Sequence, residues 1–459
     1  MKVRLAIAAG LSIAIVAVSA LLSAGSSAPT SEYTQLYAVP SSGLIRALHA
    51  QIGTLTIRYE QSHYPGSSHT PNKPFTANPK ESMLTSVSSG DPARPVNSIQ
   101  LVSSIKGIPW PATGEAAVGV EGLNFIESNL PDNPPVPIAS LTKMMTAYVI
   151  LQDHPLSPGE NGPAIRVDEA DIETTYNDEL NDETIVPIVH GEVLTEKQAL
   201  EGLMVHSACN LAYVLARWDS GTASAFVAKM NRTAKALGLA STRYVGPAGF
   251  SPGSVSTAAS LTKLAMDAMS IPAFARIVDH PEINLPNAGV LENYVSAIGQ
   301  NGVIGVKSGF TYQSEGCVVL AAVRYIGNTQ VTMIATVTGQ GGMDPLGSAQ
   351  NTALAIIDSI PSRLFIDSTD LSGYIVGNIQ PSWLKVHSGK KAQYSIVTSG
   401  NLSLLEWPGA DPRVTIEFGK RYYTCNILHP NIQVGTMTAS LGSFTSEVPL
   451  VLPHAPPCR

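Results

Sequence analysis

The stretch that decides the fold is Pro137-Ile-Ala-Ser140-Leu-Thr-Lys143-Met-Met-Thr-Ala-Tyr-Val-Ile-Leu151. A proline and a loop lead into apolar residues at helical spacing, which predicts the start of a buried helix. Ser140 and Lys143 are three residues apart, so they lie on one face near the helix N-terminus. A lysine whose charged form is disfavoured by burial and by the positive helix end can take the proton of a serine hydroxyl. The pair therefore indicates acyl transfer through a serine ester.

The residues around this pair favour catalysis over an ordinary helix cap. A serine followed three residues later by a lysine is common, and most such pairs are a cap and a solvated side chain. Here Leu141, Met144, Met145, Ala147 and Val149 leave little of the polar face that a surface helix shows. A lysine in such a helix needs a functional reason.

Composition excludes several other classes of function. The 459 residues, 44% hydrophobic with 38 glycines, predict a globular protein of two or three domains. A net charge of -7 with few basic clusters argues against nucleic acid as a partner. The acidic run from Asp168 to Glu183 has no metal-ligand spacing and is interpreted as a solvated face.

The four cysteines are too scattered for a zinc or redox motif. Two of them, Cys209 and Cys317, lie in the middle of the chain, whereas Cys425 and Cys458 lie near its end. Only the late pair is predicted to be able to form a structural disulfide.

The N-terminus predicts export. Lys2 and Arg4 precede an uncharged apolar stretch that runs from Leu5 to about Gly25, and small residues follow through Ala28. Residues 1–28 are therefore a signal peptide or, because the apolar stretch is long, an uncleaved membrane anchor. Either way the rest of the chain is expected on the extracellular side, secreted or anchored in the cell envelope, with membrane contact only through this segment.

Composition also divides the chain into expected domains. Residues rich in Ser, Thr, Pro and Asn follow the N-terminal segment and predict a linker or extension, with one short helix around 44–52. Strands are predicted at Ala116–Val120, Cys317–Val323 and Val331–Val337, and alternating strands return late in the chain. The expected parts are a linker or extension at 29–105, a catalytic domain at 106–365, a small β domain at 367–452, and a tail at 453–459.

Two further motifs follow the first in sequence. His206-Ser207-Ala-Cys209-Asn210 precedes a helical pattern, and Ser207 is either a second catalytic hydroxyl or an ordinary serine at a helix end. Gly305-Val-Lys307-Ser308-Gly309-Phe310 places a lysine, a hydroxyl and a glycine on a predicted edge strand. This third motif would let a ligand backbone approach closely and meet a positive charge, which suits a small carboxylate, but it is also compatible with an ordinary hairpin.

Taken in order, the three motifs resemble those of the penicillin-recognising serine enzymes. Within that superfamily the chain is similar to the low-molecular-mass D-alanyl-D-alanine carboxypeptidases, over roughly Pro109 to Ser362. The resemblance implies an α/β (α+β) fold, with a β-lactamase/transpeptidase-like catalytic domain of antiparallel sheet and clustered helices. A small all-β domain would follow it.

The resemblance also implies roles for the matching residues. Ser140 would be the nucleophile and Lys143 its general base, while Ser207 would relay a proton to the leaving D-alanine. The substrate carboxylate and backbone would be bound by the third motif and by residues of the second. The residues concerned are Lys307, Ser308, Gly309, Cys209 and Asn210, and the backbone amides of Ser140 and Phe310 would form the oxyanion hole.

The chain departs from the family pattern at three places. Cys209 stands where the family has asparagine, and Asn210 follows one residue later, about 100° around a helix. We expect Ser207 to precede the helix proper, so that Cys209 lies near Lys143. Ser308 replaces a threonine and keeps the hydroxyl. No arginine or lysine occurs between Arg324 and Arg363, where the family often has an arginine for the carboxylate.

The activity that the resemblance implies is removal of the terminal D-alanine from peptidoglycan stem peptides through an acyl-enzyme, with acylation by penicillins and other β-lactams. It implies no metal and no organic cofactor. The alternatives are a DD-endopeptidase, a transpeptidase, a β-lactamase, or a catalytically weak wall-binding protein. Ser260-Leu-Thr-Lys263 repeats the first motif, but choosing it would reverse the family order, which favours Ser140.

Overall fold

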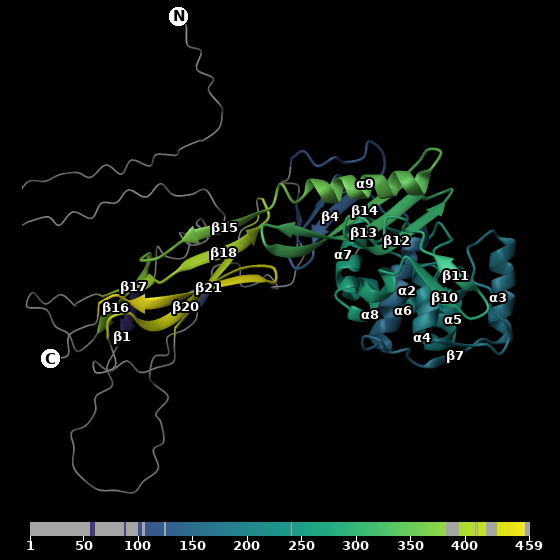
Figure 1. Ribbon diagram of the computed structural model, residues 1–459, viewed down its shortest axis with the longest axis horizontal. Helices are drawn as coiled ribbons and strands as arrows, with labels where there is room; N and C mark the ends of the chain where they lie inside the picture. The colour runs from purple at the N-terminus through teal and green to yellow at the C-terminus, as the bar shows by residue number, and fades with distance from the viewer. Residues whose placement is uncertain are drawn as a thin grey trace, which may run out of the picture. The chain divides into compact units, whose positions relative to one another are not determined.

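The computed structural model describes residues 56–59, 87–88, 100–102, 106–123, 125–239, 241–381, 394–408, 410, 412–418 and 429–454. Its central element is a six-stranded sheet with the order β12-β13-β14-β4-β5-β3 (Figure 1). All neighbours are antiparallel except β3 and β5. The strands are β12 (Val303–Thr311), β13 (Glu315–Ile326), β14 (Thr329–Gln340), β4 (Glu115–Val120), β5 (Phe125–Ser128) and β3 (Gln100–Val102). The predicted antiparallel sheet is confirmed.

Both faces of this sheet are covered. Side chains alternate between the faces of a strand, and in β13 Val318 and Leu320 belong to one hydrophobic cluster while Val319 and Ala321 belong to another. Helix α9 (Pro345–Ser359) packs on the first face. Helix α7 (Ala258–Met269) packs on the second, and Thr262 Oγ1 donates to Thr336 Oγ1 of β14 at 2.8 Å. Strands buried on both sides need apolar residues throughout, which explains the near-continuous Val, Leu and Ala run of β13.

Helices cluster on the α7 side of the sheet. The first is the predicted one: α2 (Thr142–Asp153) is buried at nine of its residues, and a single 3-10 turn, η1 (Ala139–Leu141), precedes it. The remaining helices are α3 (Glu169–Leu180), α4 (Glu196–Met204), α5 (Cys209–Ser220), α6 (Ala223–Ala236) and α8 (Pro272–Val278). Short strand pairs join their loops: β6 (Val136–Pro137) with β9 (Val255–Ser256), β7 (Ala164–Arg166) with β8 (Val193–Thr195), and β10 (Glu282–Leu285) with β11 (Gly289–Glu292).

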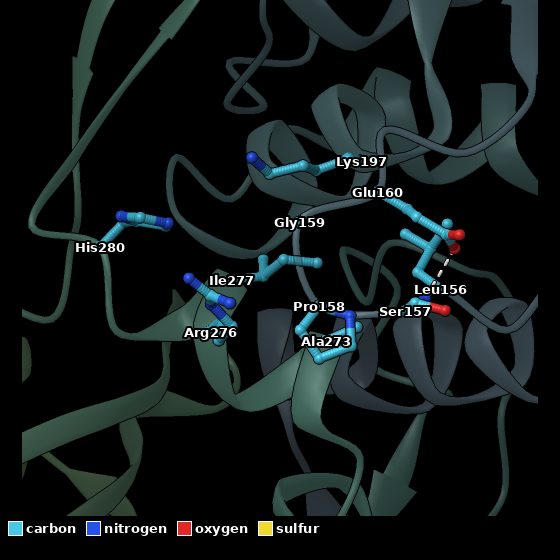
Figure 2. Close-up of a pocket in the computed structure, with 10 residues that line it drawn as sticks. All are labelled: Leu156, Ser157, Pro158, Gly159, Glu160, Lys197, Ala273, Arg276, Ile277 and His280. Atoms are coloured by element: carbon cyan, nitrogen blue, oxygen red, sulfur yellow. Dashed lines mark hydrogen bonds between the residues drawn. The ribbon is translucent and has the colours of Figure 1, made fainter.

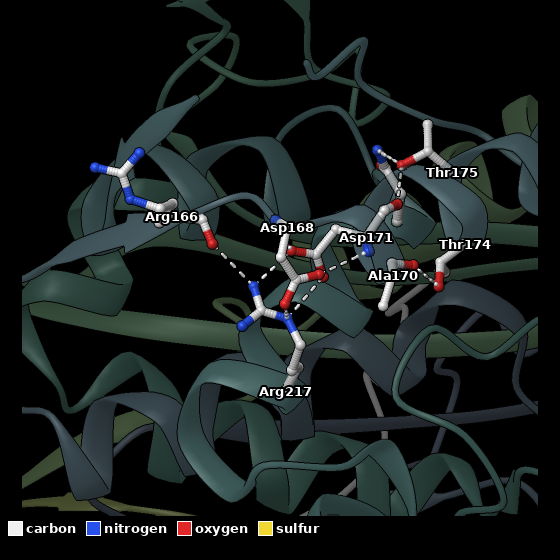
Figure 3. A network of polar contacts seen from close by, with 8 residues as sticks. Arg166, Asp168, Ala170, Asp171, Thr174, Thr175 and Arg217 are labelled. Atoms are coloured by element: carbon white, nitrogen blue, oxygen red, sulfur yellow. Dashed lines mark hydrogen bonds and ion pairs between the residues drawn. The ribbon is translucent and has the colours of Figure 1, made fainter. Parts of the chain in front are cut away.

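The acidic run is the solvated face that its composition predicts only in part, because Asp171 and Asp178 are buried while Glu169, Glu173, Glu179 and Asp182 are exposed. It forms α3, which begins with a capping box between Asp168 and Asp171. Asp171 is 3% exposed, and its carboxylate accepts two hydrogen bonds from the Arg217 guanidinium of α5, at 2.9 and 2.5 Å (Figure 3). A planar guanidinium matches a carboxylate in this way. The acidic helix is therefore fixed against α5 by its own charges.

A second polar link holds the segment after α3. The Asn210 side chain of α5 accepts from Val186 N at 3.1 Å and donates to Val186 O at 2.8 Å and to Thr175 Oγ1 at 3.1 Å. Thr175 in turn donates to the backbone carbonyl of Asp171 at 2.7 Å. One buried amide thus joins α5, α3 and the loop around Val186.

After α9 the described residues form strands and no helix, as predicted. A seven-stranded sheet has the order β1-β16-β17-β21-β20-β19-β2, and β15 pairs with β18. The bounds are β15 (Phe365–Asp370), β16 (Ile375–Pro381), β17 (Tyr394–Thr398), β18 (Asn401–Glu406), β19 (Arg413–Phe418), β20 (Ile432–Leu441) and β21 (Phe444–Leu452). The predicted linker contributes β1 (Thr56–Tyr59), β2 (Val87–Ser88) and β3, so it is not wholly without strands. The domain boundaries stay a prediction.

Several sequence predictions fall outside the described residues. These are the segment 1–28, the short helix around 44–52 and the pair Cys425 and Cys458. Cys209 and Cys317 are buried free thiols. No helix of the described part is both long and apolar enough to cross a membrane.

We expect Asn210→Ala to lower the free energy of unfolding by about 2 to 4 kcal/mol, because it leaves buried polar groups of Val186 and Thr175 without partners. Denaturant unfolding followed by circular dichroism measures the change. Asn177→Ala, at an exposed position of α3, is the matched control and should unfold like the parent. Equal unfolding midpoints for the two variants would contradict the structural role of Asn210.

Candidate active site

The buried amine of Lys143 lies at the centre of the candidate site. Its Nζ is 2.9 Å from Ser140 Oγ, 3.3 Å from Cys209 Sγ and 2.8 Å from the carbonyl oxygen of Ala248. The side chain is fully buried. Three acceptors match the three hydrogens of an ammonium group, and a neutral amine in the same place would accept the proton of Ser140.

The backbone around Ser140 explains why the amine and the hydroxyl meet. Ala139 has a φ of 45°, a conformation rare for residues with a side chain. Gly249 approaches it so closely that an added Cβ would lie 2.0 Å from Ala139 O. Non-glycine residues in this region are often found at functional sites, where the surrounding packing holds them.

The second motif lies in a break between two helices. Helix α4 ends at Met204 and α5 begins at Cys209, while Ser207 has a φ of 64° and is 6% exposed. Ser207 therefore precedes the helix, as expected, and Cys209 lies beside Lys143, as also expected. His206 stacks on Tyr294 next to this loop, with ring centroids 5.2 Å apart.

Asn210 does not bind substrate in this arrangement, and that prediction is wrong. Its side chain is 1% exposed and is fully engaged with Thr175 and Val186. The reason is the step of one residue on α5, which turns Asn210 away from Cys209 and Lys143.

The third motif lies on β12, which is an edge strand as predicted. Lys307 is 1% exposed and its Nζ donates to Ser308 O at 3.0 Å. A Cβ added to Gly309 would lie 2.8 Å from Ser140 N, so glycine is required for β12 to pass this close to the nucleophile. Phe310 follows with its ring exposed.

Burial and neighbouring charges shift the pKa values of two groups in the site, Lys307 and Cys209. Burial, and after it the charge of Lys143, holds the pKa of Lys307 well below its usual value. Burial raises the pKa of the Cys209 thiol to about 11, so this group is neutral at pH 7. Two ammonium groups in one buried site are disfavoured, and the direction of the shift makes Lys307 the one that loses its charge more readily. An amine 2.9 Å from a serine hydroxyl can activate it for attack on a carbonyl once that amine has given up its own proton.

Two acidic residues that the motifs did not identify, Asp178 and Glu183, lie near the site. Burial, and then Glu183, raises the pKa of Asp178 to about 7, with Lys143 opposing this rise. Burial raises the pKa of Glu183, while the Cys209 thiol and the Lys143 charge lower it. Their only sequence signal was membership of the acidic run, which does not separate them from its exposed residues.

The repeated motif at Ser260 does not form a comparable pair. Ser260 Oγ accepts from Thr257 Oγ1 at 3.1 Å, within the cap of α7. Lys263 Nζ instead donates to Asp267 Oδ2 at 3.0 Å. The same four residues therefore give a cap and a surface ion pair at one place and a buried serine–lysine pair at the other.

A groove elsewhere on the helical cluster contains none of the predicted site residues (Figure 2). It lies beyond the C-terminal end of α2, whereas Ser140 precedes the N-terminal end. Its lining residues are Leu156, Ser157, Pro158, Gly159, Glu160, Lys197, Ala273, Arg276, Ile277 and His280. Among the described residues no group of His, Cys, Asp and Glu could hold a metal ion.

Comparisons with known proteins agree with this geometry. The family model described as D-alanyl-D-alanine carboxypeptidase matches residues 126–340, which contain all three motifs. A D-alanyl-D-alanine carboxypeptidase of a Streptomyces species is 30% identical over 210 residues, which are 40% of this chain and 67% of the relative. A D-alanyl-D-alanine endopeptidase of Escherichia coli is 29% identical over 237 residues, 49% of this chain and 71% of the relative.

A solved structure extends the likeness to the fold. Penicillin binding protein 5 from Haemophilus influenzae matches with a TM-score of 0.52 and 18% identity, and the match covers 76% of this chain and 98% of that one. The motif order, the buried serine–lysine pair and the sequence matches lead to one conclusion. The chain belongs to the D-alanyl-D-alanine carboxypeptidase family.

Proposed function

We propose that this protein is an exported serine carboxypeptidase that removes the terminal D-alanine of peptidoglycan stem peptides through an acyl-enzyme on Ser140. The observation that carries the proposal is the 2.9 Å contact of Ser140 Oγ with the buried Lys143 Nζ, beside the edge strand of the third motif. Family membership supports the substrate class, and penicillins are the expected inhibitors.

Acylation would begin with transfer of the Ser140 proton to the neutral Lys143 amine. The Ser140 oxygen then bonds to the carbonyl carbon of the penultimate D-alanine, and the backbone amides of Ser140 and Phe310 donate to the resulting oxyanion. The peptide C–N bond breaks as the leaving amine takes a proton relayed by Ser207. Water then hydrolyses the ester, with Lys143 again accepting a proton.

Lys307 would bind the substrate carboxylate, with Ser308 and Gly309 alongside. An anion next to Lys307 favours its charged form and offsets the cost of burying that charge. A charged Lys307 in turn disfavours a second charge on Lys143. Binding of the carboxylate would therefore help to leave the general base neutral when the substrate is in place.

A second candidate activity is that of an endopeptidase, because the Escherichia coli relative carries that name and matches over a comparable length. The chemistry at Ser140 would be the same, and only the leaving group would differ. Incubation with cross-linked muropeptides and with a linear D-alanyl-D-alanine peptide separates the two: free D-alanine marks the carboxypeptidase, and loss of the cross-link marks the endopeptidase.

The Ser140 assignment predicts the site of penicillin labelling. A fluorescent penicillin should acylate Ser140, because among the serines of the described residues only this one has the buried amine of Lys143 within hydrogen-bond distance. Ser140→Ala should lose the label, and peptide mapping after digestion locates it in the parent. Ser260→Ala is the matched control and should label normally, since Lys263 is engaged with Asp267. An adduct on the Ser260 peptide would reverse the assignment.

The second motif predicts two unequal effects. Cys209→Asn should keep D-alanine release or raise it by about tenfold at most. The reason is that an amide is a stronger hydrogen-bond partner for Lys143 than a thiol is. Ser207→Ala should lower release strongly, since it removes the proposed proton relay. Release of D-alanine from a linear peptide measures both. A Cys209→Asn variant as inactive as Ser207→Ala would contradict these roles.

The proposed location predicts access from outside the cell. Lys2 and Arg4 should be retained on the cytoplasmic side while the rest of the chain crosses the membrane. Protease added to cells without their wall should degrade the catalytic region, and a cytoplasmic marker protein should survive. Full protection of the catalytic region together with cytosolic fractionation would contradict export.

A further inference from the structure

Two aromatic side chains are exposed next to each other at the C-terminal end of β12. Phe310 is 41% exposed and Tyr312 is 91% exposed. Their ring centroids lie 5.7 Å apart in an edge-to-face arrangement. A single exposed apolar residue is common on a protein surface and needs no explanation. Two rings in contact on the strand that passes the nucleophile form an apolar surface beside the candidate active site, which we call the aromatic pair.

The aromatic pair begins one residue after the closest approach of β12 to Ser140. A Cβ added to Gly309 would lie 2.8 Å from Ser140 N, and Phe310 follows Gly309 directly. Only the backbone amide of Phe310 has a role in the acylation chemistry proposed above. Both rings are therefore free to contact another part of the substrate.

The turn that carries Tyr312 is held by buried hydrogen bonds. Ser314 is 4% exposed, its Oγ accepts from Thr311 N at 3.0 Å, and its own N donates to Thr311 Oγ1 at 3.1 Å. Gly316 lies so close to the start of α9 that an added Cβ would be 2.0 Å from Pro345 O. The backbone at Tyr312 is therefore fixed before a ligand binds, which lowers the entropy cost of binding there.

The direction of a bound substrate follows from the roles proposed for β12. Lys307 would bind the terminal carboxylate, and Phe310 N would bind the oxygen of the scissile carbonyl. In the peptide this carbonyl precedes the carboxylate by one residue, so the substrate runs antiparallel to β12. Its acyl part, which is N-terminal to the scissile bond, continues from Phe310 toward Tyr312. An extended residue advances by about 3.3 Å, so the residue before the penultimate D-alanine comes beside the aromatic pair.

We infer that the aromatic pair is a specificity-determining subsite for the acyl part of the substrate: the rings of Phe310 and Tyr312 pack against a long aliphatic side chain on the residue before the penultimate D-alanine. The inference rests on the proposed function. Methylene groups gain from contact with the rings because both surfaces leave water. A side chain as short as that of alanine does not reach across both rings.

The test compares two peptides that differ only in this residue, Nα,Nε-diacetyl-L-lysyl-D-alanyl-D-alanine and Nα-acetyl-L-alanyl-D-alanyl-D-alanine. Both side chains are uncharged, so charge does not contribute to the difference. In the parent, kcat/KM for D-alanine release should be higher for the lysyl peptide. Tyr312→Ala should lower this value by about fourfold for each methylene group that loses its contact, and should leave the value for the alanyl peptide unchanged.

Two further variants separate packing against the ring from other effects. Tyr312→Phe keeps the ring and should keep the preference of the parent. Tyr325→Ala removes an exposed tyrosine at the opposite end of β13 from this turn and should also keep it. Because Tyr312 is almost fully exposed, its substitution removes no buried contact, and each Tyr312 variant should unfold like the parent.

A second pair of ligands separates this inference from the proposed function. Benzylpenicillin carries a phenylacetyl group on the acyl side of its reactive bond, and aminopenicillanic acid carries none. If the parent releases no D-alanine, the proposed function is contradicted, and the preference is then measured as the ratio of the acylation rates of these two compounds. A parent that reacts with neither pair of ligands overturns the function and the inference together.

Three results overturn the inference while the function stands. The first is a parent without a preference, or one whose preference is unchanged in Tyr312→Ala. The second is an equal loss for both ligands of a pair, because that is a general disturbance of the oxyanion hole. The third is a Tyr312→Phe variant that behaves like Tyr312→Ala, since the hydroxyl and not the ring would then make the contact.

Discussion

Burial of a lysine amine is the constraint on which the rest of the site depends. Removing an ammonium group from water costs several kcal/mol unless its hydrogens find acceptors. Lys143 finds three, from three different parts of the chain: Ser140 one turn away, Cys209 at the start of α5 and the carbonyl of Ala248. Each of these acceptors must be held in place for the buried amine to be stable. The packing of the helical cluster therefore fixes the geometry of the site. Two of these three acceptors follow residues with a positive φ: Ala139 precedes Ser140, and Ser207 lies two residues before Cys209.

The cysteine at position 209, where the family has asparagine, changes the hydrogen-bond partner of the Lys143 amine. An amide side chain offers a donor and an acceptor, whereas a thiol offers one weak hydrogen and a weakly accepting sulfur. Next to Cys209 the loop after α3 is bonded to α5, through Cys209 N to Thr184 O and through Asn210 to Val186. Asn210, the residue that kept the amide, supports this loop and not the substrate.

The sheet supplies the other wall of the site. Strand β12 pairs with β13 on one side only, so its other side faces the turn that carries Ser140. Because Gly309 has no side chain, this strand passes against the nucleophile, and the charge of Lys143 helps to lower the pKa of Lys307 on the same strand. Packing of α7 and α9 on opposite faces fixes the sheet. A carboxylate that enters between the strand and the helices would meet one amine while the other remains free to act as a base.

The sequence by itself determined the local features: a buried helix from Thr142, an antiparallel sheet, a late region of strands, and three motifs in an order that identified the family. These follow from the 3.6 and 2.0 residue periods of apolar side chains and from short motifs, which are properties of neighbouring residues. It also placed Ser207 outside the helix, because only a loop lets Ser207 and Cys209 face one cleft. Only the tertiary structure supplied the acceptors of the buried Lys143 amine, since Ala248 and Cys209 are distant in sequence and no spacing rule connects them to Lys143, whereas Lys263 bonds to Asp267. It likewise separated the buried Asp171 and Asp178 from the exposed residues of the acidic run, because burial depends on which helix packs against α3, and a charge pattern contains no information about that partner.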